Sequence, residues 1–122
     1  MISIDVYQGN KGWIGVDLDG TLAYYDKWRG MGHIGAPIAP MADKVREWLK
    51  SGVNIKVFTA RVCSGQRKED VNLFMCIYTN WCYQHFGQQI PVTSEKDFNM
   101  IMLYDDRCVQ VECNTGRVIG ET

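Results

Sequence analysis

Three short apolar runs, each closed by polar residues, limit most strongly what this chain can fold into. The runs and the residues that close them are Trp13–Val16 before Asp17, Val53–Phe58 before Thr59, and Ile101–Tyr104 before Asp105 and Asp106. Apolar runs of this length, bounded by turn-forming residues, predict buried strands. We therefore expect three strands that each end in polar side chains.

A helical pattern follows the first of these runs. Pro40 suits the first turn of a helix, because its missing N–H has no partner there in any case. Val45, Trp48 and Leu49 then recur on one helical face, and Gly52 is expected to stop the helix. This segment predicts a helix between the first two strands.

A longer helix is predicted from about Gln66 to His85, because apolar residues recur there at three- and four-residue intervals. Beyond it we expect a short strand beginning at Pro91-Val92, one helical turn over Lys96–Asn99, and a C-terminal hairpin that turns at Asn114-Thr115-Gly116. The alternation of strands and helices predicts an α/β fold, a Rossmann-like parallel sheet with helices on both faces.

The bulk composition limits the possible classes of protein. With 122 residues the chain has room for one domain, and its 13 Lys and Arg nearly balance its 14 Asp and Glu. A net charge of -1 gives no support for nucleic-acid binding through overall charge. The five cysteines show no C-x-x-C spacing, so we do not expect structural zinc. We do not expect disulfides either, because the chain has the character of a cytosolic protein.

No targeting or membrane signal is apparent. Met1–Gly12 contain no long apolar run and no cleavage-type signal, and no stretch approaches the length of a membrane span. We therefore expect a soluble, cytoplasmic protein without a membrane partner. A homo-oligomer is possible, but nothing in the sequence supports one.

The strand ends are expected to form a site. In a parallel sheet the carboxyl ends of the strands meet at one edge, where ligands bind. Asp17, Asp19, Asp105, Asp106 and the Thr59 hydroxyl would then converge on one small region. Carboxylates so close together repel, and Mg2+, which prefers hard oxygen ligands, relieves this repulsion. The sequence therefore predicts a magnesium site.

The spacing of Asp17 and Asp19 suits phosphoryl transfer. Just past a strand end, residues two apart can face the same site, so that Asp17 can attack phosphorus while Asp19 protonates the leaving oxygen and later deprotonates water. Gly20 permits a sharp turn after the strand, and the Thr21 hydroxyl can hold that turn.

Three segments carry a resemblance to a known family. Ile14–Leu22, with the sequence IGVDLDGTL, resembles the first motif of the haloacid dehalogenase-like (HAD) superfamily, the DxDGT phosphatases. Val57–Arg61 (VFTAR) resembles the second motif, and Leu103–Asp106 (LYDD) resembles the paired-Asp form of the fourth. Together these segments span most of the chain and imply a HAD-like fold.

The resemblance implies a role for each acidic position. Asp17 would be the nucleophile that becomes an aspartyl-phosphate and would also touch the metal. Asp19 would be the general acid/base, with its backbone carbonyl on Mg2+. Asp105 and Asp106 would complete the metal site, and Asp106 is favoured for direct contact. Because dehalogenases of this superfamily lack the second carboxylate, Asp19 favours phosphoryl transfer.

The resemblance also implies residues that contact the phosphoryl group. Thr59 would hydrogen-bond it, and Ala60 and Arg61 would lie beside it. The third motif requires a lysine, for which Lys96 is the better candidate and Lys68 the alternative. Proline often follows this lysine in the family, whereas Asp97 follows it here.

The spacing of the motifs leaves no room for a separate cap domain. Residues 23–40, rich in glycine and proline, predict an irregular loop or short hairpin that would serve as a lid on a single domain, residues 1–122. An open site suits a bulky substrate or closure by another subunit. The expected partner is a phosphorylated substrate, either a small molecule or a nucleic-acid end.

Several assignments remain open. Three roles are open for the loop residues Tyr24, Tyr25, Trp28 and His33: they line the substrate entrance, they stack on a base, or they pack the loop onto the domain. Arg61 either reaches a substrate phosphate or forms a structural salt bridge. The leading function is a Mg2+-dependent phosphomonoesterase. The alternatives are a phosphatase of nucleotides or nucleic-acid ends, and a catalytically inert binding protein of the same fold.

Overall fold

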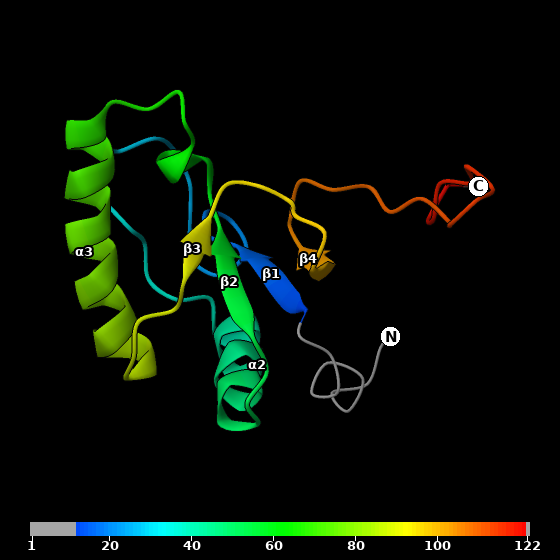
Figure 1. Ribbon diagram of the computed structural model, residues 1–122, viewed down its shortest axis with the longest axis horizontal. Helices are drawn as coiled ribbons and strands as arrows, with labels where there is room; N and C mark the ends of the chain where they lie inside the picture. Colours follow the sequence, from blue (N-terminus) through cyan, green and yellow to red (C-terminus); the bar gives the residue numbers. More distant parts are fainter. Residues whose placement is uncertain (1–11, 122) are drawn as a thin grey trace.

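A computed structural model of the protein describes residues 12–121. In this part of the chain four parallel strands form one sheet in the order β3-β2-β1-β4 (Figure 1). Their bounds are β1 Trp13–Asp17, β2 Ile55–Phe58, β3 Val92–Thr93 and β4 Met100–Tyr104. The predicted α/β class is confirmed, whereas the expectation that Met1–Lys11 carry no targeting signal lies outside the described residues.

The helices begin and end close to the expected signals. Helix α2 spans Ala39–Lys50, with a proline in its first turn. Helix α3 spans Lys68–Phe86 and is followed by Gly87 in the left-handed conformation. A short 3-10 helix, η1, covers Ala60–Val62. None of the helices between residues 12 and 121 has the length and apolar character needed to cross a membrane.

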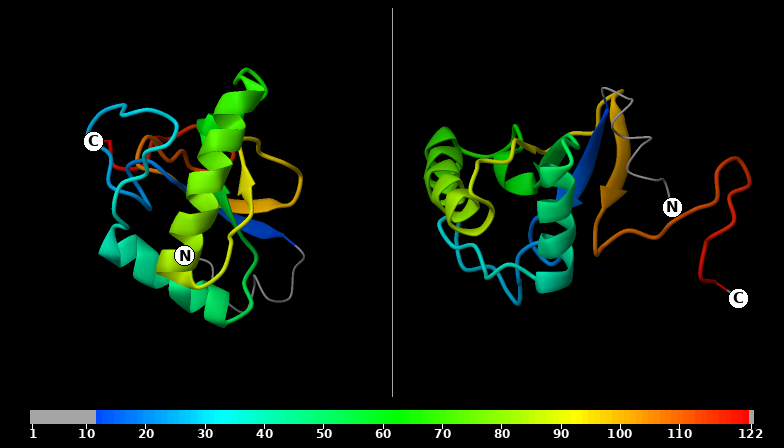
Figure 2. Two further views of the ribbon diagram at one scale, coloured as in Figure 1. Left: turned by 90° about the vertical axis from the view of Figure 1, so that its left-hand side faces the viewer. Right: turned by 90° about the horizontal axis from the view of Figure 1, so that it is seen from below.

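Both long helices pack on the same face of the sheet, which differs from the expected arrangement on both faces. The connections from β1 to β2 and from β2 to β3 step in the same direction across the sheet. Right-handed crossovers then place α2 and α3 on one side (Figure 2). A single core joins this face to both helices, and its members include Ile14, Val16, Ile55, Val57, Val45, Trp48, Phe74 and Tyr78.

The opposite face is held by a cluster around Trp13. The Trp13 indole N–H donates to Asp97 at 2.8 Å, and the Lys56 ammonium lies 4.7 Å from the centre of the Trp13 ring. Asp97 also accepts from the Asn99 N–H at 2.8 Å. The Asp97 side chain thus bonds to the backbone of the turn at Phe98 and Asn99, and Lys96–Asn99 do not form the expected helical turn.

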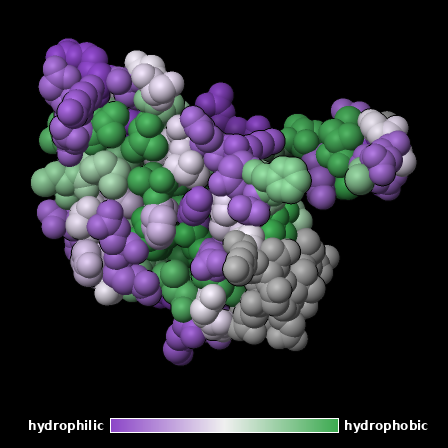
Figure 3. Space-filling model, in the orientation of Figure 1, coloured by the Kyte–Doolittle hydropathy of each residue, from purple (hydrophilic) through white to green (hydrophobic). Residues whose placement is uncertain are grey.

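The C-terminal segment does not form the paired strands of the expected hairpin. One isolated antiparallel bridge joins Val111 and Val118, with Asn114 in the left-handed conformation between them. A two-stranded hairpin without further packing is marginal in water. The segment after Asp106 runs away from the sheet and projects from the body of the molecule (Figures 1 and 3).

Residues 23–38 form an irregular loop that a hydrogen bond joins to α3, whereas the last two residues of the predicted 23–40 segment already belong to α2. An isolated antiparallel bridge joins Ala23 to Pro37 near the two ends of the loop. The Trp81 indole N–H of α3 donates to the Gly35 carbonyl at 3.0 Å. Gly35 approaches the Tyr24 carbonyl so closely that a Cβ at Gly35 would lie 2.0 Å from it. The loop therefore has a defined path over the carboxyl ends of the strands.

Candidate functional site

Three carboxylates meet at the carboxyl edge of the sheet. Asp17 ends β1, and Asp105 and Asp106 directly follow β4, which pairs with β1. One oxygen of each of these side chains lies within 4.8 Å of the corresponding oxygens of the other two. We call Asp17, Asp105 and Asp106 the carboxylate cluster. Parallel pairing of β1 with β4 is the reason that residues distant in sequence converge here.

Burial and the neighbouring carboxylates disfavour the charged form of Asp17. The pKa of Asp17 rises from its ordinary value of 3.8 to about 8, chiefly because the carboxyl is partly buried and then because Asp105 repels its charged form. A hydrogen bond with Asp106 adds to the rise. Hard oxygen ligands under such repulsion fit a divalent cation such as Mg2+.

Gly20 and Thr21 connect the two strand ends of the cluster. The Thr21 hydroxyl accepts the Asp106 N–H at 2.9 Å, donates to Asp106 Oδ1 at 3.0 Å and lies 3.4 Å from Asp17 Oδ2. Gly20 has a φ of 94°, and a Cβ there would lie 2.6 Å from the Asp106 carboxylate. Glycine is therefore required at this position for Asp106 to approach the turn, and Thr21 fixes its carboxylate.

The Asp19 carboxylate points to a different partner. Arg61 donates to both of its oxygens, from Nη2 at 2.7 Å and from Nε at 3.0 Å. The arginine side chain is 6% exposed and that of Asp19 is 22% exposed. This bidentate geometry is among the stronger ion pairs that proteins form. Among the described residues, Asp19 therefore has a direct counter-charge that the carboxylate cluster does not have.

Arg61 also holds the loop. Its Nη1 points at the main-chain carbonyls of three loop residues, nearest His33 at 2.7 Å and also Met31 and Gly30. The guanidinium lies 5.0 Å from the centre of the Trp28 ring and 5.3 Å from the centre of the Phe74 ring. Asp19, the loop and α3 are thus joined through a single buried side chain.

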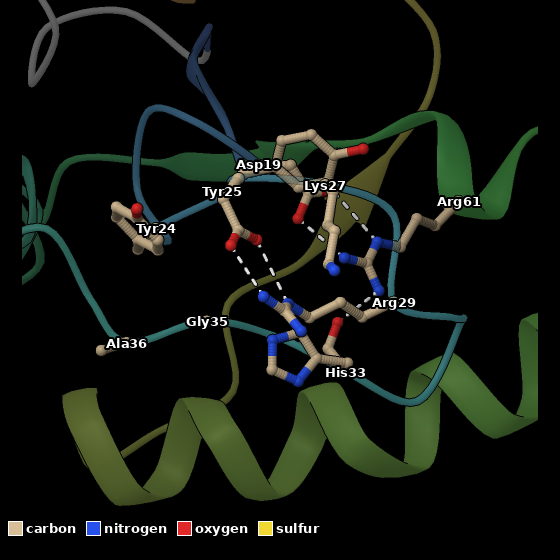
Figure 4. Close-up of a pocket in the computed structure, with 10 residues that line it drawn as sticks. Asp19, Tyr24, Tyr25, Lys27, Arg29, His33, Gly35, Ala36 and Arg61 are labelled. Atoms are coloured by element: carbon tan, nitrogen blue, oxygen red, sulfur yellow. Dashed lines mark hydrogen bonds and ion pairs between the residues drawn. The ribbon is translucent and has the colours of Figure 1, made fainter.

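Two hollows meet at the Asp19–Arg61 pair. The first, which we call the carboxylate cleft, has a volume of about 380 Å³ and is lined by Asp17, Asp19, Tyr25, Trp28, Phe58, Thr59, Ala60, Arg61, Gln66, Asp105 and Arg107. The second, the loop cavity, has a volume of about 300 Å³, and its lining includes Tyr24, Lys27, Arg29 and His33 (Figure 4). Asp19, Tyr25 and Arg61 line both hollows.

The remaining predicted site residues have different positions. Thr59 is buried at the end of β2, and its hydroxyl accepts the Arg61 N–H at 3.2 Å. Ala60 lines the carboxylate cleft. Neither Lys96 nor Lys68 is among the described residues that line this cleft. The Lys96 ammonium acts instead on Cys108, whose pKa is raised by burial and then by Asp105, and opposes that rise.

Two cleft residues were missed by sequence reasoning. Arg107 and Gln66 both line the carboxylate cleft, one after the acidic pair that follows β4 and the other shortly before α3. The position of Arg107, directly after the two carboxylates, was a signal that could have identified it. Gln66 carried no such signal, because its place in the cleft depends on the path of the chain between η1 and α3.

Comparisons with protein-family models, with curated protein sequences and with solved structures found no significant match to this chain.

Proposed function

We propose that this protein is a Mg2+-dependent phosphomonoesterase of the HAD type, with Asp17 as its nucleophile. The carboxylate cluster carries the proposal, because Asp17 sits beside two further carboxylates at the ligand-binding edge of a parallel sheet. The order of the three sequence segments that resemble family motifs supports the same function.

The residues of the cluster suit the requirements of the proposed cofactor. Asp17, Asp105 and Asp106 would hold Mg2+, which when bound supplies charge neutralisation for these carboxylates and for the phosphoryl oxygens. The Thr21 hydroxyl fixes the Asp106 carboxylate, and the buried Thr59 hydroxyl lies in the wall of the cleft beside Asp17. The chain thus provides oriented oxygen ligands and a floor for the phosphoryl group.

In the first step Asp17 attacks phosphorus, and the bond from phosphorus to the leaving oxygen breaks as Asp19 gives that oxygen a proton. In the second step Asp19 takes a proton from water, and this water attacks phosphorus. The aspartyl-phosphate bond then breaks, inorganic phosphate leaves and the Asp17 carboxylate is restored. Each step uses one carboxylate as nucleophile or leaving group and the other as acid or base.

Asp19 must turn from Arg61 before it can do this work. Both of its oxygens accept hydrogen bonds from Arg61, so neither carries a proton toward the cleft in the described conformation. The same arginine holds the loop carbonyls of residues 30, 31 and 33. Movement of the loop and release of Asp19 are therefore linked, which supports residues 23–40 as the lid of the proposed enzyme.

Hydrolysis of an aryl phosphate tests the proposal. We expect turnover that needs Mg2+, stops with a chelator and falls by several orders of magnitude in Asp17→Asn, because a nucleophile is lost. Asp43→Asn, a change at an exposed carboxylate of α2, is the matched control and should keep wild-type activity. A folded protein that hydrolyses no phosphomonoester with Mg2+ present would contradict the catalytic proposal.

A second candidate is a catalytically inert binding protein. The observation that favours it is the Asp19–Arg61 pair, which in the described conformation occupies the carboxylate needed as general acid. An inert protein would still bind Mg2+ through the carboxylate cluster. Mg2+ binding without turnover, measured by calorimetry beside the same assay, would select this second candidate.

A further inference from the structure

Two aromatic rings stand exposed on the wall of the carboxylate cleft. Trp28 is 55% exposed and Tyr25 is 44% exposed, yet both line the same hollow as Asp17 and Thr59. Thr59 is 3% exposed, which places the phosphoryl-binding end of the cleft at its floor and the rings at its rim. Exposed rings beside a buried polar floor present an unused surface on which a planar group can stack.

The Trp28 ring contacts Arg61 at this rim. Its centre lies 5.0 Å from the Arg61 guanidinium, which also lies 5.3 Å from the centre of the Phe74 ring. Arg61 in turn pairs with Asp19, so one guanidinium contacts both the Trp28 ring and that carboxylate. A planar group stacked on the exposed Trp28 ring would lie apart from a phosphoryl group at the buried floor, and a spacer would have to join the two.

We infer, given the proposed phosphatase function, that the substrate is a nucleoside phosphate whose base stacks on Trp28 and Tyr25 at the rim of the carboxylate cleft. In such a molecule a sugar separates the base from the phosphate, which fits a cleft with the Trp28 ring at its exposed rim and Thr59 at its buried floor. A phosphotyrosine carries its phosphate directly on the ring and does not provide this separation. Stacking on aromatic side chains is tolerant of base identity.

The charge of the cleft fits the same substrate class. Arg107 lines the cleft on the side of the cluster, where it can receive a further phosphate. The neighbouring loop cavity adds Lys27 and His33, beyond Tyr25. A nucleoside phosphate can be free or can stand at the end of a strand, and both sources present the same base, sugar and phosphate to these residues.

Intrinsic fluorescence tests the stacking directly, because Trp28 is the exposed member of the four tryptophans. Trp13, Trp48 and Trp81 are 3%, 8% and 6% exposed. We expect adenosine monophosphate with Mg2+ to quench the fluorescence of Asp17→Asn protein in a saturable way, whereas ribose phosphate does not. Equal quenching by both ligands, or by neither, would overturn the inference. This measurement needs no turnover, so it separates failure of the inference from failure of the proposed function.

The kinetic test compares kcat/KM for adenosine monophosphate with kcat/KM for ribose phosphate. We expect Trp28→Ala to lower the ratio of the two values by roughly 5- to 100-fold, the range for loss of one stacked base. Trp28→Phe should keep most of the ratio, because a ring remains. Tyr83→Ala removes a comparably exposed aromatic of α3 and should leave the ratio unchanged. A uniform loss for both substrates in Trp28→Ala would mean that Trp28 only packs the loop.

A third arm separates the two sources of the nucleotide. If the substrate is a strand end, a single-stranded oligonucleotide with a terminal phosphate is hydrolysed faster than adenosine monophosphate, and Arg107→Gln lowers only the oligonucleotide rate. If it is free, the mononucleotide is the better substrate. Either result supports the inference, whereas preference for a phosphotyrosine peptide over both would overturn it.

Discussion

Asp17 and Asp19 are two residues apart, yet their carboxylates have opposite surroundings. Asp17 lies among Asp105 and Asp106, and its pKa rises to about 8 because burial and these neighbours disfavour its charge. Asp19 pairs with the buried Arg61 through two hydrogen bonds. The end of β1 thus directs the Asp17 carboxylate toward two other carboxylates, where a bound cation would relieve the repulsion. It directs the Asp19 carboxylate toward Arg61, a cation of the same chain.

The two arrangements affect the stability of the fold differently. Repulsion within the carboxylate cluster lowers the stability of the folded chain unless a cation binds there. The Asp19–Arg61 pair needs no external ligand, and it also joins the loop to α3. The first arrangement makes ligand binding favourable, and the second makes the position of the loop depend on the state of one carboxylate. Substitutions on each side should therefore have opposite effects on stability.

The largest expected effect is on the paired side. Arg61→Met should lower the free energy of unfolding by about 3 kcal/mol, because it leaves the Asp19 carboxylate without its counter-charge in a largely buried site. Denaturant unfolding measures this loss. Arg29→Met, which removes an exposed pair with Asp26 in the same loop, is the control and should stay close to wild type. Equal effects of the two changes would show that the buried pair contributes no more than a surface contact.

The cluster side should respond in the opposite direction. Without a divalent cation, Asp17→Asn should raise the melting temperature at pH 8 by roughly 5 °C, the change typical of about 1 kcal/mol in a domain of this size. The physical reason is the removal of a carboxylate that is partly buried and repelled by Asp105. Thermal unfolding in the presence of a chelator measures it.

The sign of the pH dependence follows from the raised pKa of Asp17. Below about pH 4 the Asp17 carboxyl is protonated in both the folded and the unfolded chain, so Asp17→Asn is no more stable than wild type through this effect. Between pH 4 and about 8 the unfolded chain has lost the proton that the folded chain keeps, so wild-type stability falls as pH rises. The advantage of Asp17→Asn should grow across this window and then level off. An advantage that is constant with pH would contradict the raised pKa.

The smallest expected effect concerns the alignment of the cluster. Thr21→Val keeps the shape of the side chain but removes the hydroxyl that joins Asp106 to the β1 turn. Loss of a residue that orients a metal ligand commonly weakens metal affinity by about 10-fold or more. Mg2+ titration by calorimetry should show this weakening, while Thr115→Val, at a hydroxyl of the C-terminal turn, should not. Unchanged affinity in Thr21→Val would mean that the strand ends alone align Asp106.

Most of the sheet could be predicted from the sequence, because apolar runs and helical periodicity are local signals. Asp17, Thr59 and Asp105 were placed at strand ends in this way, and parallel pairing brings Asp17 beside Asp105. The prediction that helices cover both faces of the sheet was wrong, since the side on which α2 and α3 pack depends on strand order. The prediction of a helical turn at Lys96–Asn99 was wrong, because the Asp97 carboxylate accepts a hydrogen bond from the indole of Trp13, which lies in a strand distant in sequence.

The partners of the site residues were harder to predict than their positions. The sequence left the role of Arg61 open between substrate binding and a structural salt bridge. Its hydrogen bonds to Asp19 and to the loop depend on the path of residues 30–33, which carry no periodic pattern. Thr21 was expected to hold its own turn, and its hydroxyl does donate to Asp17, but it also joins Asp106, which follows β4. Side-chain contacts between segments far apart in sequence decide these details, and no local signal encodes them.

The pairing of β4 with β1 has a consequence for the order of folding. The hydrogen bond between Thr21 and Asp106 joins positions 85 residues apart, whereas β1 and β2 are joined by a single loop and helix. Closing the longer loop costs more chain entropy, and contacts of such separation form slowly. The β1–β2 pair can therefore form before the acidic side chains of the carboxylate cluster meet. Repulsion among these side chains then opposes the pairing of β4 with β1. On the ribosome, most of the chain has been made before the three carboxylates can come together.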